Sequence, residues 1–336
     1  MELYKKTSLA MLDHDIAPLW ADALRYPIEE IRALYLLRRQ AWSCQTKEEL
    51  DACISRIRCF AESIRLRPDA GERRYLWDGQ IPTVTAYDAN PDRRWLRDPD
   101  FAPYYLEYLQ PETVQPVGAV IMIAGAQQGE NSLHECVQTC FDFHALGYQC
   151  FILNSRPNHS PWSALEAGAD VSRCVRMIRH RAADYRIQPN HIAVMGMSNG
   201  GIAGESCILY FSGEKDLADY FPGYQPDEID RCRPCQDVFL CVYGARIVGT
   251  DTSDLQYTFP PTMYATGLED KLGIENLNLV LREHFDRGTR IAIHTYAGHP
   301  HGDSGMKIID SVGRPDFDTW VGHADVFMRD TYLHYQ

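Results

Sequence analysis

From about residue 75 the chain alternates short apolar runs with amphipathic segments, and this alternation restricts the fold more than any other feature. The run at 117–126 is almost continuously apolar, as is typical of a strand buried on both faces of a parallel sheet. Similar runs predict further strands at 81–89, 148–154, 191–197, 237–245, 262–267 and 290–298. Helical periodicity predicts intervening helices at about 130–146, 171–182, from 200 onward and at 274–287. Strands that alternate with helices in this way predict an α/β fold with a mostly parallel central sheet covered on both faces.

The N-terminal part of the chain has a different, purely helical pattern. Apolar residues recur at helical spacing in two segments, with the members Ile28, Ile31, Leu34, Leu37 and then Leu50, Cys53, Ile57, Phe60. We therefore expect a helical N-terminal extension or cap at 1–72 and one large α/β domain at 73–336. The apolar stripes of these helices also suggest that they pair copies of the chain in a homo-oligomer.

Composition limits the partners and the compartment. The 336 residues carry a formal net charge of −13, without a basic run, which argues against a nucleic-acid partner. No segment approaches the roughly 20 apolar residues that span a bilayer, so no membrane association is expected. The start lacks the apolar region of a secretory signal, and eleven cysteines without a framework pattern indicate a reducing compartment. We expect a cytoplasmic protein.

No segment indicates a metal or a cofactor. Cys232 and Cys235 have the two-residue spacing of metal and redox sites, but no second pair at matching spacing accompanies them. Structural thiols are therefore the favoured interpretation. Neither a Gly-rich phosphate loop nor a dinucleotide-binding pattern occurs.

The sequence Gly196-Met197-Ser198-Asn199-Gly200 stands between a predicted buried strand and a predicted helix. This is the setting of a nucleophile elbow, in which a sharp turn exposes a serine hydroxyl above the sheet. The alternative is a loop of small residues with no chemical role. A serine also needs a base, and on this architecture an acid and then a histidine should follow it in the chain.

Candidates for both partners follow the last two predicted strands. His301 is the favoured base, with His299 as a wall of the site or a substrate contact. Asp270 is the favoured acid, which would fix the histidine tautomer and stabilise the imidazolium. Glu269 is the alternative acid. The alternative is that these residues have no catalytic role. The histidines would then be ordinary surface residues and the acid would stand at a helix N-terminus.

Backbone amides complete the predicted site. The amide of Asn199 would point into it from a helix N-terminus, where amide donors have no intrahelical partner. A second donor is expected where glycines interrupt the 117–126 run, at the amides of Ala126 and Gln127. A plain glycine turn is the alternative for this segment.

With these residues in place, the chain resembles the α/β-hydrolase superfamily, and most closely its acetyl-xylan-esterase and related carbohydrate-esterase branch. Hormone-sensitive-lipase-like and prolyl-oligopeptidase-like families are neighbours. The resemblance covers roughly 115–335 and rests on the stretches 156–201, 224–245, 260–276 and 296–302. It implies that Ser198 is the nucleophile, His301 the base and Asp270 the acid. Two departures are the few glycines around Ala126 and the presence of Asn199 where a small residue is usual.

These observations lead to the hypothesis of a serine esterase that releases short-chain acyl groups, acetyl above all, from a sugar or oligosaccharide such as a xylo-oligosaccharide. It would act through an acyl-enzyme and without a cofactor. Aromatic residues in the predicted loops could stack on sugar rings, with core packing as the alternative for each: Trp162, Tyr243, Tyr257, Tyr264 and Trp320. The competing hypotheses are a prolyl-oligopeptidase-like peptidase or acylaminoacyl hydrolase, and a non-catalytic binding protein on the same fold.

Overall fold

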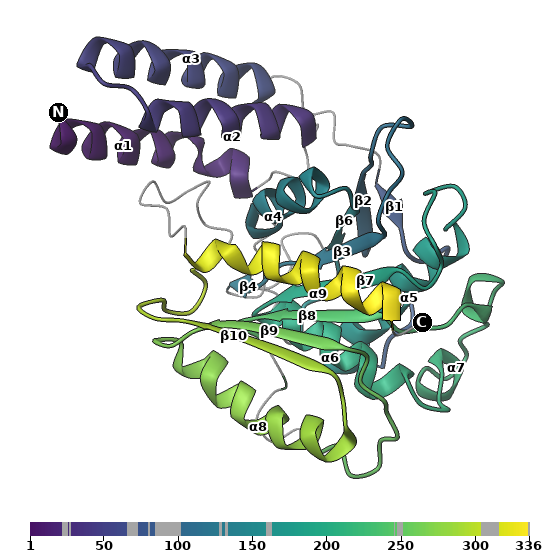
Figure 1. The fold of residues 1–336 in the computed structure, drawn as a ribbon. Coiled ribbons are helices and arrows are strands. Elements are labelled where there is room, and N and C mark those ends of the chain that lie inside the picture. The colour runs from purple at the N-terminus through teal and green to yellow at the C-terminus, as the bar shows by residue number, and fades with distance from the viewer. Residues whose placement is uncertain are drawn as a thin grey trace.

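The computed structural model describes residues 1–21, 26, 28–65, 73–79, 81–84, 102–127, 130–131, 134–158, 163–244, 246, 251–303 and 316–334. Most of the strand predicted at 81–89 lies outside these residues, as do Trp162 and residue 72 at the expected division of the chain. The division itself therefore stays a prediction. In Figure 1 a twisted sheet is covered by helices on both faces, and three N-terminal helices lie side by side near α4.

The sheet has eight strands in the order β1-β2-β6-β3-β7-β8-β9-β10. Their bounds are Arg74–Tyr75 (β1), Tyr104–Tyr108 (β2), Ala119–Ile123 (β3), Gln149–Asn154 (β6), Ile192–Met197 (β7), Val238–Val242 (β8), Thr262–Gly267 (β9) and Ile291–Tyr296 (β10). Within this sheet β1 pairs antiparallel with β2, and β2 pairs antiparallel with β6, whereas the other neighbours pair parallel. β3 and β7 are buried at every position. The predicted, mostly parallel sheet is confirmed; β1 and β2 were not predicted.

Alternate residues of the central strands enter two separate cores. Val120 and Met122 of β3 point into one core, whereas Ala119 and Ile121 point into the other. The first core contains side chains of α4 (His134–Ala145) and α9 (Trp320–His334), and the second contains those of α5 (Ala164–His180), α6 (Asn199–Phe211) and α8 (Lys271–Arg287). Short elements complete the body: β4 (Ala126–Gln127), β5 (Glu130–Asn131), α7 (Leu217–Tyr220) and the 3-10 turns Ile229–Arg231 and Phe317–Thr319. The helix expected from residue 130 thus begins at His134, after the β4–β5 hairpin.

The N-terminal helices are α1 (Glu2–Ala21), α2 (Ile28–Trp42) and α3 (Lys47–Arg65), and they lie within the segment expected to form a helical extension or cap. They join the first core: the rings of Tyr35 and Phe141 lie 6.1 Å apart, and Arg32 donates to the hydroxyl of Tyr108. The apolar stripes that suggested an oligomer are packed inside the chain, with Ile31 and Leu34 fully buried. This feature no longer supports pairing of copies.

The cysteines are free thiols, and no group of three metal-ligating side chains occurs within the described part of the chain. Cys235 packs against Cys207 of α6, with 3.9 Å between their sulfur atoms, so it lies in a buried contact between the segment before β8 and α6, as a structural thiol would. Among the described helices, none combines the length and apolar character needed to cross a membrane.

Candidate active site

Ser198 forms a sharp turn between β7 and α6. Its backbone has φ 49° and ψ −114°, a conformation that costs a non-glycine residue about 1–3 kcal/mol and is held only by surrounding structure. The Ser198 N–H donates to the carbonyl of Val242 at 3.0 Å, which fixes the turn to β8. A Cβ at Gly196 would lie 2.2 Å from the Gly200 carbonyl oxygen, and one at Gly200 would lie 2.2 Å from that of Ile123. The flanking glycines therefore allow the helix to start directly against the sheet.

Asn199 has a defined structural contact. Its side chain is only 6% exposed, and its Oδ1 accepts a hydrogen bond of 3.1 Å from the backbone N–H of Asn158. Asn158 follows β6, so this bond ties the loop after β6 to the elbow. The backbone amide of Asn199, the predicted oxyanion donor, belongs to the first residue of α6.

The structure brings together Ser198, His301 and Asp270, which are far apart in the chain. Ser198 Oγ and His301 Nε2 are 2.8 Å apart, and His301 Nδ1 and Asp270 Oδ2 are 2.9 Å apart. All three follow the carboxyl ends of parallel strands, namely β7, β10 and β9. With Nδ1–H donating to the carboxylate, Nε2 is the ring nitrogen left to accept the serine proton.

One backbone donor and one side-chain donor hold Asp270 in place. Asp270 is 1% exposed. Its Oδ1 accepts a hydrogen bond from the N–H of Gly273, and through this bond Asp270 caps the N-terminus of α8. The hydroxyl of Thr266 lies 3.4 Å from its other oxygen. Glu269, the alternative acid, is exposed. The contact to His301 is thus made by Asp270.

Both ring nitrogens of His299 are engaged by carboxylates, which does not support its expected contact with substrate. It is 3% exposed, and its two ring nitrogens lie 2.7 Å from Asp303 Oδ2 and 3.0 Å from Asp316 Oδ2. Its ring stacks on Phe317, with 5.1 Å between the centroids. His299 therefore anchors the loop that carries His301. No sequence pattern indicated this role, because Asp316 lies 17 residues away along the chain.

This anchor is expected to make stability depend on pH. Burial disfavours the charged ring, but the hydrogen bonds to Asp316 and Asp303 outweigh it and raise the pKa of His299 above its ordinary value of 6.5. A raised folded-state pKa contributes stability that is complete below the ordinary pKa and is lost as pH rises through the folded-state value. We expect the melting temperature of His299→Gln to fall further below that of the wild type at pH 6 than at pH 9. A difference that does not change with pH would contradict this, and His180→Gln, at an exposed position, serves as control.

The segment after β3 contains the second set of predicted oxyanion donors. Ala126 and Gln127 form β4, and the residue before them, Gly125, lies against the elbow: a Cβ there would be 3.2 Å from the Cβ of Ser198. The Gly125 N–H is engaged, because it donates to Glu135 Oε2 at 3.0 Å. The oxyanion roles of Ala126 and Gln127 stay predictions, and Glu135 is an additional residue near Ser198.

Glu135 was not predicted from the sequence. It is the second residue of α4, and its only signal was an acid in the first turn of a helix, which is common because the helix dipole favours it. Burial raises its pKa to about 7, while the Gly125 hydrogen bond and the nearby His301 act in the opposite direction.

The aromatic residues proposed to stack on sugars are packed in the interior. Tyr243, Tyr257, Tyr264 and Trp320 are each at most 6% exposed. Tyr243 instead packs on the group formed by Ser198, His301 and Asp270. Its ring meets the ring of His301 edge-on, with 5.1 Å between the ring centroids. The core-packing interpretation therefore holds for these four, and Trp162 lies outside the described residues.

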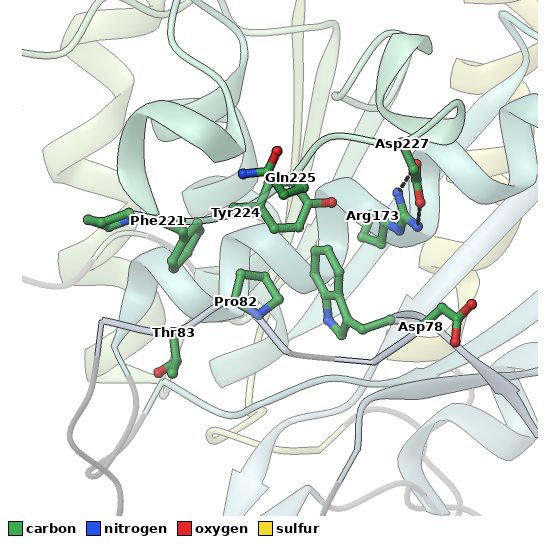
Figure 2. A pocket seen from close by; sticks show the side chains of 11 residues that line it. Asp78, Pro82, Thr83, Arg173, Phe221, Tyr224, Gln225 and Asp227 are labelled. Carbon is green, nitrogen blue, oxygen red and sulfur yellow. Dashed lines mark hydrogen bonds and ion pairs between the residues drawn. The ribbon is translucent and has the colours of Figure 1, made fainter.

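A separate cavity of about 260 Å³ lies away from the triad, between residues 77–83, α5 and residues 221–227 (Figure 2). Trp77 and Tyr224 meet edge-to-face at 6.0 Å in its wall, and the Arg173 guanidinium stacks on Trp77 at 5.3 Å. Arg173 is also paired with Asp227, as the dashed lines in Figure 2 show. None of Ser198, His301 and Asp270 lines this cavity.

Comparison with known proteins places the fold. Residues 107–206, which include the elbow, match the model of the BD-FAE family, an α/β-hydrolase esterase family. No curated protein sequence matches the chain. Solved structures do match it, at low sequence identity.

Three of these structures illustrate the likeness. An acetyl ester-xyloside bifunctional hydrolase from Caldicellulosiruptor lactoaceticus has a TM-score of 0.60 and 20% identity, over 78% of this chain and 97% of that one. A propionate-bound esterase from the Planctomycetes species Thermogutta terrifontis has a TM-score of 0.57 and 15% identity, over 79% and 96%. The same esterase phosphorylated by paraoxon also has a TM-score of 0.57 and 15% identity, over 79% and 94%. The chain has the α/β-hydrolase fold.

Proposed function

We propose that this α/β-hydrolase-fold chain is a serine carboxylesterase that removes short acyl groups, acetyl above all, from a sugar or oligosaccharide. The observation that carries the esterase assignment is the unbroken chain of contacts from Ser198 Oγ through His301 to the buried carboxylate of Asp270. A serine hydroxyl needs such a base to be a nucleophile near neutral pH.

In the first half of the reaction, Ser198 Oγ forms a bond to the ester carbonyl carbon while its proton passes to His301 Nε2. The carbonyl oxygen becomes an alkoxide beside the amides of Asn199 and Ala126. When this tetrahedral species collapses, the bond to the alcohol oxygen breaks and His301 returns the proton to that oxygen. Asp270 stabilises the imidazolium between these two steps.

In the second half, a water molecule repeats the attack on the acyl-serine. His301 takes a proton from the water as its oxygen bonds to the carbonyl carbon, and then gives a proton back to Ser198 Oγ as the acyl bond breaks. The products are a carboxylic acid and the original serine. Each step uses only groups of this chain and water.

The acyl and sugar assignments are supported by the structural neighbours. One is a hydrolase of acetyl esters and xylosides, and another holds propionate, a short carboxylate. The elbow lies within the segment that matches an esterase family. The eleven free cysteines further support a reducing compartment, and we place the protein in the cytoplasm.

A substrate panel tests this proposal. Initial rates would be measured with acetylated xylo-oligosaccharides, aryl acetate, butyrate and octanoate esters, and an aryl-amide peptide. We expect kcat/KM to fall by about 10-fold or more between acetate and octanoate, and acetylated sugars to be deacetylated. Faster cleavage of the amide than of any ester would favour the peptidase alternative, and no turnover of any of these compounds would favour a binding protein. Activity on aryl acetate without sugar deacetylation would leave the esterase but remove the sugar.

A further inference from the structure

The Glu135 carboxyl group and Ser198 both lie against Gly125. The position that a Cβ of residue 125 would occupy lies 3.0 Å from Glu135 Oε2 and 3.2 Å from the Cβ of Ser198. Glu135 therefore lies near Ser198 on the side where the segment after β3 passes. The reaction described above does not use this group.

Its hydrogen bond determines which amides can serve the reaction. Because a backbone N–H has a single hydrogen, the Gly125 amide that donates to Glu135 is not available to an alkoxide. Holding the Gly125 N–H also restrains the point from which the next peptide unit starts, and that unit carries the amide of Ala126. Donors that stabilise an alkoxide act through a fixed position, so the residue that fixes them contributes to the rate.

The charge of Glu135 matters because of what surrounds it. His301 faces it from the loop after β10, Tyr243 from the end of β8, and Cys136 is its neighbour on α4. Asp270 and Asp303 are the other carboxylates close enough to act on Tyr243. An ionised carboxylate at this place would put a negative charge beside the forming alkoxide, whereas a neutral carboxyl still accepts the Gly125 hydrogen bond.

We propose that Glu135 is a positioning residue of the acyl-transfer site, which orients the Ala126 amide through Gly125 and is uncharged in the active form. This inference rests on the proposed function. The pKa of about 7 that burial gives Glu135 places its ionisation within the range in which the enzyme can be assayed. The precedent in physical terms is a carboxylic acid kept neutral by an apolar environment beside an anionic reaction centre.

Two substitutions separate the hydrogen bond from the charge. Glu135→Gln keeps an oxygen acceptor for Gly125 and cannot ionise, and Glu135→Leu removes both. Asp142→Asn is the matched control, because it neutralises an acid on the same helix that lies near Tyr35 of α2. The readouts are kcat and KM for an aryl acetate from pH 5.5 to 9.5, the melting temperature, and labelling of Ser198 by a fluorophosphonate.

We expect the wild-type kcat to fall above pH 7 as Glu135 ionises, and Glu135→Gln to remove this fall while keeping kcat at pH 6 within about 3-fold. Glu135→Leu should lower kcat by about 10- to 100-fold at every pH, with KM changed by less than about 3-fold. Asp142→Asn should keep the wild-type profile. Because Glu135→Gln preserves the hydrogen bond, it tests the charge even if Glu135→Leu folds poorly.

Two results would overturn the inference alone: a labelled wild type whose kcat stays flat to pH 9.5, or a Glu135→Gln profile that retains the wild-type fall. A wild type that the fluorophosphonate does not label would instead overturn the proposed function, and this inference with it.

Discussion

Replacing Ser198 with alanine is expected to lower kcat/KM for an aryl acetate by about 10⁵-fold or more, with no loss of melting temperature. The nucleophile is the one group for which no other side chain at the site can substitute, and loss of the nucleophile in other serine hydrolases has effects of this size. The elbow backbone conformation, held by the Val242 carbonyl and the flanking glycines, does not depend on the hydroxyl. Alanine at this position should therefore preserve the fold.

Ser206→Ala is the matched control for this variant. Ser206 is a buried serine within α6, whereas Ser198 stands at the N-cap of the same helix. Its variant should retain wild-type kcat/KM within about 3-fold. If Ser198→Ala kept more than about a tenth of the wild-type activity, another group would have to carry out the reaction.

Replacing Asp270 with asparagine is expected to lower kcat by about 10⁴-fold, because an amide at this position favours the wrong tautomer of His301. Asparagine keeps an oxygen that can accept from the Gly273 N–H, so the start of α8 should remain intact. KM should change little, since the carboxylate has no direct access to substrate at 1% exposure. Steady-state kinetics at pH 7 to 8 with a thermal melt would measure both effects.

Glu269→Gln provides the control one residue away. It neutralises the neighbouring acid, which is exposed, and it should keep wild-type kcat within about 2-fold. A large loss in Glu269→Gln together with a small one in Asp270→Asn would reverse the assignment of the acid.

The parts of the fold that could be predicted are those whose burial shows in the local sequence. The strands β3 and β7 are buried on both faces, so their residues are apolar without interruption and the runs are visible. β2 has the sequence Tyr-Tyr-Leu-Glu-Tyr, which is rich in strand formers. It is not a continuous apolar run like those of β3 and β7, so it was not predicted. α9 was missed because polar and apolar residues alternate irregularly along it. Its apolar face is defined only by its packing on the first core.

The candidate site divides in the same way. Ser198, Asp270 and His301 were predictable because each follows a recognisable strand, and the carboxyl ends of parallel strands meet at one edge of the sheet. Glu135 was not, because its importance comes from a hydrogen bond across the β4–β5 hairpin rather than from a motif. His299 and His301 look alike in the sequence. Only the position of Asp316 and Phe317 against His299 shows which histidine is committed to holding the loop.

Intact-mass spectrometry of the protein, quenched in acid during turnover of an aryl acetate and followed by peptide mapping, tests whether Ser198 carries the acyl group. We predict an adduct of one acetyl group on the peptide that contains Ser198 in the wild type, and its absence in Ser198→Ala. Because Asp270→Asn slows both half-reactions, its adduct should form and decay more slowly. An acetyl group on another residue, or turnover without any adduct, would contradict the account.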